Sequence, residues 1–209
     1  MPDETSVEEL KLRVNLPDFS MRVVSIPKLS RVLRRKGYDI DVVREGQRID
    51  IPLPALKENF TVLLDPLEHW VSIEAETLDD AIDGWNSIFQ IFKRDFRVFR
   101  ISKCILDTSL RIKCRGDKAA DIISIITSPV KDKLNFDELV GEETKIVGFK
   151  VATPGLTIIV DEWNVDMSYY VIRVVKTSEG VEEVSEFNFE EVALSLVSRM
   201  EEMYERRNI

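Results

Sequence analysis

The feature that most constrains the fold of this 209-residue chain is an internal repeat, in which four sequence blocks recur in the same order. The first block is residues 10–15 (LKLRVN) and 110–115 (LRIKCR), where apolar and polar residues alternate. This period of two is typical of a strand with one buried face. The residues expected to face the core are Leu10, Leu12 and Val14 in the first copy and Leu110, Ile112 and Cys114 in the second.

The second block is a helix in each half. In the first half, residues 27–36 open with a proline and are followed by Gly37, which favours a helix ending at that glycine. In the second half, Asp117 is placed to cap a helix over residues 118–126, and Pro129 is expected to end it.

The third block is the clearest strand pattern. Residues 60–65 (FTVLLD) and 156–161 (LTIIVD) match at every position by residue type. Such short apolar runs bounded by turn residues predict strands. The flanking strand candidates are residues 48–51 and 145–149 before this block, and residues 70–75 and 170–175 after it.

The fourth block is a long amphipathic helix that closes each half. Thr77 with Asp80, and Asn188 with Glu191, each combine an N-cap residue with an acid three positions later. Apolar residues follow at helical spacing and predict a face packed on the core. These residues are Leu78, Ala81, Ile82, Trp85, Ile88, Phe89 and Phe92, and then Phe189, Val192, Ala193, Leu196, Met200, Met203 and Tyr204.

The blocks together predict an α+β fold built from two tandem β-α-β-β-β-β-α repeats. We expect a single pseudo-twofold domain over residues 1–209, with the first repeat at 9–95 and the second at 96–207. Consecutive short strands favour a curved antiparallel sheet with the helices on one face. Joining the two repeats edge to edge would protect one sheet edge of each.

This element order resembles the TATA-binding-protein-like fold, a duplicated saddle whose helices cover the convex face. The resemblance spans roughly residues 9–207 and rests on element order and on a hairpin leading to a capped helix, as in residues 60–85. The family's hairpins carry aromatic residues that wedge into DNA. This chain has LDPLE at 64–68 and VDEWN at 160–164 instead, and these acids would repel phosphates. The resemblance therefore implies the fold and not the family's DNA kinking.

Charge and composition narrow the classes of partner and compartment. The net charge is −9, which disfavours indiscriminate binding to nucleic acid or anionic lipid. Residues 93–118 nevertheless carry nine basic and three acidic residues. The two cysteines, Cys104 and Cys114, suggest a reducing compartment rather than a disulfide framework. Without a signal-peptide pattern or a long apolar run, we expect a cytoplasmic protein with no membrane contact.

Candidate chemistry centres on one histidine, His69, which lies near Asp65 and Glu68. One interpretation is a small acid–base or metal site, and the other is a polar hairpin turn. The sequence has no phosphate-binding glycine loop, nucleophile elbow or zinc-ligand spacing. We therefore expect a non-catalytic protein without a metal site or cofactor.

Five cations are the candidate nucleic-acid-binding residues. Lys11 and Arg13 lie on the first strand, and Arg111, Lys113 and Arg115 lie on its repeat partner. If the two strands meet near the middle of the sheet, their outward side chains would form one basic stripe able to contact phosphates. Acids on neighbouring strands, such as Asp50 and Glu74, could neutralise that stripe.

Aromatic residues at the hairpin ends favour a different partner. Trp70, Trp163, Tyr169 and Tyr170 could serve as exposed anchors for a protein surface, or could cap the core. We expect a binding module that uses its curved sheet face for a protein partner or for self-association. Nucleic-acid binding through the basic stripe is the alternative, followed by a small-ligand binder or an enzyme of unknown reaction.

Overall fold

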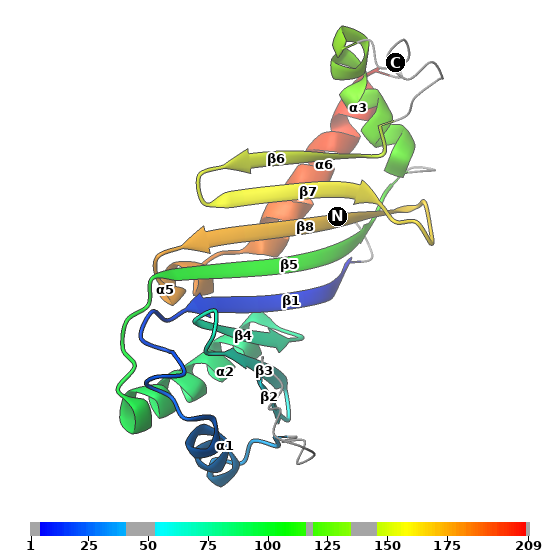
Figure 1. The fold of residues 1–209 in the computed structure, drawn as a ribbon. Coiled ribbons are helices and arrows are strands. Elements are labelled where there is room, and N and C mark those ends of the chain that lie inside the picture. Colours follow the sequence, from blue (N-terminus) through cyan, green and yellow to red (C-terminus); the bar gives the residue numbers. More distant parts are fainter. Residues whose placement is uncertain (1–4, 41–52, 116–118, 135–145, 208–209) are drawn as a thin grey trace. The chain divides into compact units, whose positions relative to one another are not determined.

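The computed structural model describes residues 5–40, 53–115, 119–134 and 146–207 (Figure 1). The fold is α+β, as predicted, with one eight-stranded antiparallel sheet in the order β2-β3-β4-β1-β5-β8-β7-β6. The strands are β1 (Thr5–Asn15), β2 (Leu53–Lys57), β3 (Phe60–Asp65), β4 (Trp70–Ala75), β5 (Lys103–Lys113), β6 (Gly148–Thr153), β7 (Leu156–Glu162) and β8 (Tyr169–Ser178). The helices are α1 (Ile26–Arg35), α2 (Leu78–Ile91) with its π-helical extension η1 (Phe92–Phe96), α3 (Ala119–Leu134), α5 (Val181–Ser185) and α6 (Phe189–Arg207).

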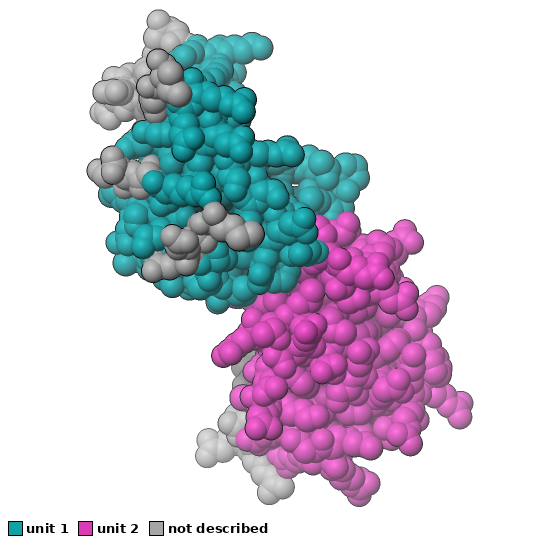
Figure 2. Space-filling model, turned by 180° about the vertical axis from the view of Figure 1, so that it is seen from behind, with its two compact units in different colours: residues 1–8, 108–175, 188–209 teal, residues 9–107, 176–187 magenta. Residues whose placement is uncertain are grey.

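The chain divides into two compact units (Figure 2). Unit 1 comprises residues 1–8, 108–175 and 188–209, and unit 2 comprises residues 9–107 and 176–187. Each unit is described by itself below.

The described residues contain three strands, rather than the predicted four, between the first and last long helices of each half. The four-strand repeat is therefore not confirmed. The candidate strand at 48–51 lies outside the described residues, and the one at 145–149 is found later, as β6. The shift follows from a two-residue turn at 154–155, where Gly155 has a positive φ of 85° and Thr153 pairs with Leu156.

The alternation predicted for the two long strands is confirmed, and both strands extend further toward the N-terminus than expected. β1 begins at Thr5 and β5 at Lys103. Every second residue is buried from Cys104 onward in β5 and from Leu10 onward in β1, so these stretches each contribute one face to a core. The buried residues predicted from the repeat are Leu10, Leu12, Val14, Leu110, Ile112 and Cys114, none more than 6% exposed.

In unit 2, the end of α1 and the start of α2 lie where the sequence predicts them. At the end of α1, Gly37 has a φ of 83°, and the amides of Gly37 and Tyr38 donate to the carbonyls of Arg34 and Leu33. These two bonds form a Schellman motif, the ending that a glycine in this position favours. At the start of α2, the Asp80 amide donates to the Thr77 hydroxyl, as predicted.

α2 packs against β3 and β4 at close range. Gly84 makes this approach possible, because a Cβ added there would lie 3.0 Å from the Phe60 ring and 3.1 Å from the Ile73 side chain. Larger residues would force the helix away from the sheet.

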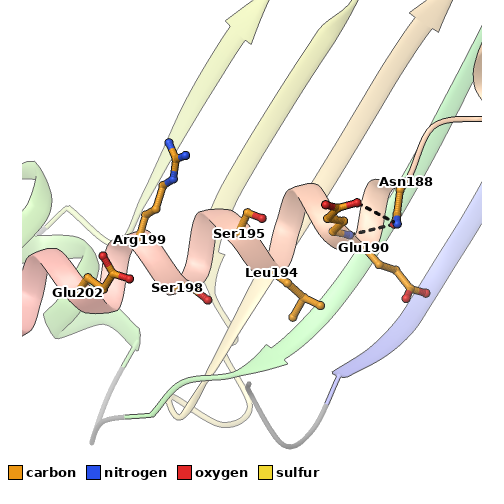
Figure 3. A pocket seen from close by; sticks show the side chains of 8 residues that line it. Asn188, Glu190, Leu194, Ser195, Ser198, Arg199 and Glu202 are labelled. Carbon is orange, nitrogen blue, oxygen red and sulfur yellow. Dashed lines mark hydrogen bonds between the residues drawn. The ribbon is translucent and has the colours of Figure 1, made fainter.

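In unit 1, α6 lies across one face of the strands (Figures 1 and 3). Asn188 caps it, since its side chain accepts from the Glu191 amide at 3.0 Å. Of the predicted apolar stripe, Phe189, Ala193 and Met200 are buried, whereas Met203 is 45% exposed. Val197 and Glu201 are buried as well, so the covered face of α6 is rotated from the predicted one at its C-terminal end.

The prediction that Pro129 ends its helix is wrong, because α3 continues to Leu134. Proline removes the amide that would bond the carbonyl four residues earlier, here that of Ile125. That carbonyl instead accepts from the Ser128 hydroxyl at 2.8 Å and from the Arg207 guanidinium at the end of α6. The helix survives because tertiary contacts replace the missing bond. Asp117, the expected cap, lies outside the described residues.

Candidate binding surfaces

In unit 2, the two predicted phosphate-binding cations already have partners. The Lys11 ammonium forms an ion pair with Glu74 on the neighbouring strand β4. The Arg13 guanidinium lies 4.8 Å above the centre of the Trp70 ring. A cation in such an arrangement gains from the ring's negative face and loses water contact.

In unit 1, Arg111 is engaged in the same two ways. It forms an ion pair with Glu8 at 3.2 Å. Its guanidinium lies 4.4 Å from the centre of the Trp163 ring and 5.5 Å from that of Tyr169. The Lys113 ammonium lies 5.9 Å from the Tyr169 ring centre.

Arg115, the fifth predicted cation, lies beyond the end of β5 and is turned toward α6. Its amide donates to the Glu201 carboxylate at 2.8 Å, and its guanidinium lies 3.6 Å from the second oxygen of that carboxylate. Glu201 is only 5% exposed. A buried carboxylate needs such partners, so the structure gives Arg115 a role in packing unit 1.

Lys11 and Arg13 belong to unit 2, and the other three cations belong to unit 1. That all five cations form one continuous basic stripe therefore stays a prediction. Within each unit the charge is already balanced locally, and a paired cation has less to gain from a phosphate. Asp50, the other expected neutralising acid, lies outside the described residues.

The β7–β8 hairpin end of unit 1 exposes apolar side chains beside Arg111. Val165 is 79% exposed and Met167 is 51% exposed. They lie between Trp163 and Tyr169, whose rings meet edge to face with centres 5.7 Å apart. We call Arg111, Trp163, Val165, Met167 and Tyr169 the hairpin patch. Tyr170, also predicted as an anchor, is instead fully buried.

Asp166 fixes the loop that carries the hairpin patch. Its carboxylate accepts from the Ser168 amide at 2.9 Å and the Ser168 hydroxyl at 2.6 Å. These two hydrogen bonds lower the pKa of the Asp166 carboxyl, and the charges of Lys113 and Arg111 lower it further. The loop backbone is also tied down, because the amides of Cys114 and Ala119 donate to the carbonyls of Ser168 and Met167.

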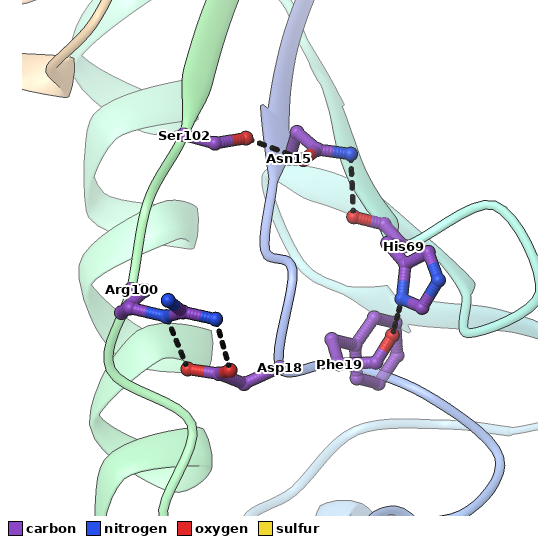
Figure 4. Close-up of polar contacts among 6 residues, drawn as sticks. All are labelled: Asn15, Asp18, Phe19, His69, Arg100 and Ser102. Atoms are coloured by element: carbon purple, nitrogen blue, oxygen red, sulfur yellow. Dashed lines mark hydrogen bonds and ion pairs between the residues drawn. The ribbon is translucent and has the colours of Figure 1, made fainter.

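In unit 2, His69 forms hydrogen bonds that hold the β3–β4 turn against residues 15–19 (Figure 4). Its Nδ1 lies 2.7 Å from the Phe19 carbonyl oxygen, so Nδ1 carries the proton and donates. The His69 carbonyl in turn accepts from the Leu16 amide and the Asn15 side chain. Asp65 accepts from the amides of residues 67 and 68, so it shapes the turn. These bonds support the polar-turn interpretation of His69.

The same corner of unit 2 contains two further polar contacts. Arg100 and Asp18 form a two-point ion pair, with nitrogen–oxygen distances of 3.0 and 3.2 Å (Figure 4). The Ser102 amide and hydroxyl donate to the backbone and side-chain oxygens of Asn15. The turn between β3 and β4 and the segment leading to β5 are thus both held against residues 15–19.

Two further titratable groups, the Cys104 thiol and the Tyr170 hydroxyl, are buried. Burial raises the pKa of the Cys104 thiol to about 12, with a further contribution from Glu183. Burial also raises the pKa of Tyr170, whose hydroxyl has no hydrogen-bond partner among the described residues. Neither group titrates near neutral pH. Within the described part of the chain, no three His, Cys, Asp or Glu side chains are grouped to hold a metal ion.

A hollow of about 540 Å³ lies along the outer side of α6 (Figure 3). Its lining comes from one helix and is mostly acidic and hydroxylated. The lining residues are Asn188, Glu190, Glu191, Leu194, Ser195, Ser198, Arg199 and Glu202. Ligand sites place a few polar groups from several elements around an apolar cavity, and this shallow surface lacks that arrangement.

Comparisons with known proteins add no assignment. No protein-family model matches the chain, and no curated protein matches its sequence. Among the described helices, none has the length and apolar character needed to cross a membrane.

Sequence reasoning found the aromatic members of the hairpin patch but missed its apolar centre. Val165 and Met167 alternate with polar residues at 164, 166 and 168. That period of two was the available signal, but it could not show which side chains the turn exposes.

We predict that replacing Glu201 with Ala destabilises the protein by about 2–4 kcal/mol. The change leaves the Arg115 amide without its acceptor and removes a buried ion-pair partner. Glu202→Ala is the matched control, because this exposed neighbour forms only a surface pair with Arg206. Urea unfolding followed by circular dichroism measures the free energy of unfolding of both variants. Equal stability of the two variants would contradict the role given to Glu201.

We predict that His69→Ala lowers stability by about 1–2 kcal/mol through loss of the bond to Phe19. Zn²⁺, Ni²⁺ and Mn²⁺ should not raise the melting temperature of the wild type. Glu68→Ala is the control, since its exposed side chain lies in the same turn. A metal-induced rise that His69→Ala abolishes and Glu68→Ala retains would restore the metal-site interpretation.

Proposed function

We propose that this chain is a non-catalytic binding module that docks a protein through the hairpin patch of unit 1. The observation that carries the proposal is the exposure of Val165 and Met167 beside a stacked arginine and two aromatic rings. Large apolar side chains gathered at one surface point are the usual mark of an interaction site.

The composition of the patch supports a protein partner. Aromatic residues, methionine and arginine are enriched at the centres of protein interfaces, and a few of them usually supply most of the binding energy. Trp163 and Tyr169 are half-buried, so they are held rigidly while part of each ring stays accessible.

The rigidity of the loop further supports this role. Asp166 and Ser168 form side-chain hydrogen bonds within it, and the Trp163 amide donates to the Tyr169 carbonyl at 3.0 Å. A surface already held in one shape loses little conformational entropy on binding.

Local charge favours an apolar protein surface as the partner over a phosphate backbone. Arg111 is paired with Glu8, and Asp166 lies close enough to Lys113 and Arg111 for their charges to lower its pKa. Two cations and two acids thus cancel around the patch. Burying it against apolar side chains costs less than opening these pairs to bind phosphates.

We also propose that the two halves of the chain are diverged copies of one unit, as in the TATA-binding-protein-like saddle. Support comes from the order of a strand, a helix, three strands and a long helix among the described residues of each half, with the short helix α5 inserted before the long helix of the second half. A tight two-residue turn joins β2 to β3 and β6 to β7, and a polar cap begins α2 and α6.

The proposal predicts that Val165→Asp combined with Met167→Asp weakens partner binding by at least about 30-fold, the effect typical of a hot spot. Met203→Asp is the matched control, because Met203 is comparably exposed on α6. Proteins retained by wild type and by the Met203 variant, but lost by the double variant, are then purified and their affinities measured. Sedimentation equilibrium of the same variants tests a second copy of this chain as the partner.

Two results would contradict the proposal. One is that the double variant keeps every binding partner and any self-association at wild-type affinity. The other is that a labelled nucleic acid binds tightly and the double variant binds it equally well.

A further inference from the structure

A small basic pocket lies in unit 2, separate from the hairpin patch and independent of the proposed function. Its volume is about 280 Å³, and it opens between the end of α1, the end of β2 and the junction of α2 with η1. The polar residues that line it are Lys36, Lys57, Ser87, Gln90, Arg94 and Asp95.

Local backbone features bring three cations together there. The Schellman motif at Gly37 places Lys36 directly after the last residue of α1, as the C-cap of that helix. Lys57 ends β2, and its ammonium lies 5.2 Å from the centre of the Tyr38 ring and 5.9 Å from that of Phe60. Arg94 lies in the π-helical turn η1, a distortion of helices that is frequent at functional sites.

The three cations are set apart by their lack of an acidic ion-pair partner within the described part of the chain. Among the described residues, neither Lys36, Lys57 nor Arg94 forms an ion pair. Asp95 supplies the single carboxylate of the lining. Three like charges around one small space repel each other, and an anion placed between them relieves that repulsion. This differs from the sheet face, where Lys11 and Arg111 each have an acidic partner.

The floor of the pocket provides neutral donors as well. The Tyr38 hydroxyl donates to the Ser87 hydroxyl oxygen at 2.8 Å. Because that oxygen accepts from Tyr38, the Ser87 proton is left to donate elsewhere. Gln90 adds an amide, so the pocket offers hydrogen-bond donors from α1, β2, α2 and η1 around one point.

We infer that this pocket binds the phosphate group of a small phosphate monoester. A phosphate carries up to two negative charges and presents several acceptor oxygens, which suits two ammonium groups, a guanidinium and a hydroxyl donor. A volume of about 280 Å³ is enough for a phosphate with a few attached atoms. The Asp95 carboxylate and the Gln90 side-chain carbonyl can accept hydrogen bonds, so a monoester with a hydroxyl near its phosphate matches the lining.

The test is a titration of the full chain with inorganic phosphate and with glycerol 3-phosphate at constant ionic strength, read by thermal shift and by amide chemical shifts. Both probes should bind saturably and raise the melting temperature, and the monoester should bind more tightly. Lys36→Gln and Arg94→Gln should each weaken binding at least tenfold. Arg35→Gln is the matched control, since it makes the same charge change on α1 outside the pocket lining.

The site is supported if Arg35→Gln retains saturable binding and the two pocket variants lose it. Chemical-shift changes of the Ser87 and Gln90 amides in the wild type locate the site even if a variant fails to fold. Tighter binding of inorganic phosphate than of the monoester would overturn the assigned ligand class. Absence of saturable binding, or equal weakening by all three substitutions, would overturn the site itself.

Discussion

The period-two alternation of β1 and β5 is the constraint on which the rest of the structure depends. Alternate residues are buried along β5 and in the second half of β1, so these stretches must be covered on one face and leave a polar face on the other. In unit 2, the long capped helix α2 packs on β3 and on β4, the strand that pairs with β1. The polar faces explain why the cations of these strands find acids and aromatic rings close by.

Strand type and helix capping could be predicted because they depend on neighbouring residues. β3, β4 and the caps Thr77 and Asn188 follow directly from alternation and cap chemistry. The end of α3 could not, since the Ile125 carbonyl left open by Pro129 is bonded by Arg207, 82 residues further along, as well as by Ser128. The pairing of Arg115 with Glu201 is hidden for the same reason, as a buried glutamate on a helix has no local sequence signal.

The candidate sites could likewise be predicted only where they depend on residues close together in the sequence. The aromatic hairpin ends were visible in the sequence, whereas Val165 and Met167 became candidates only through their exposure. The five basic strand residues were visible as well, but their partners were not. Three cations that form no ion pair among the described residues lie elsewhere, just after α1, at the end of β2 and in η1. Charge on a surface therefore indicates a phosphate site only where the fold leaves that charge without an acidic partner.

The structure indicates a local charge balance, in which acids and aromatic rings of each unit engage the basic residues of the sheet. Fluorescence anisotropy with labelled duplex DNA, single-stranded DNA and RNA, at low and near-physiological salt, tests it most directly. Because these cations are already engaged, we expect no saturable binding with a steep salt slope. Saturable, salt-steep binding that Arg111→Ser and Lys113→Ser weaken and flatten, and that Arg35→Gln leaves intact, would contradict it and make the sheet face a phosphate-contacting surface.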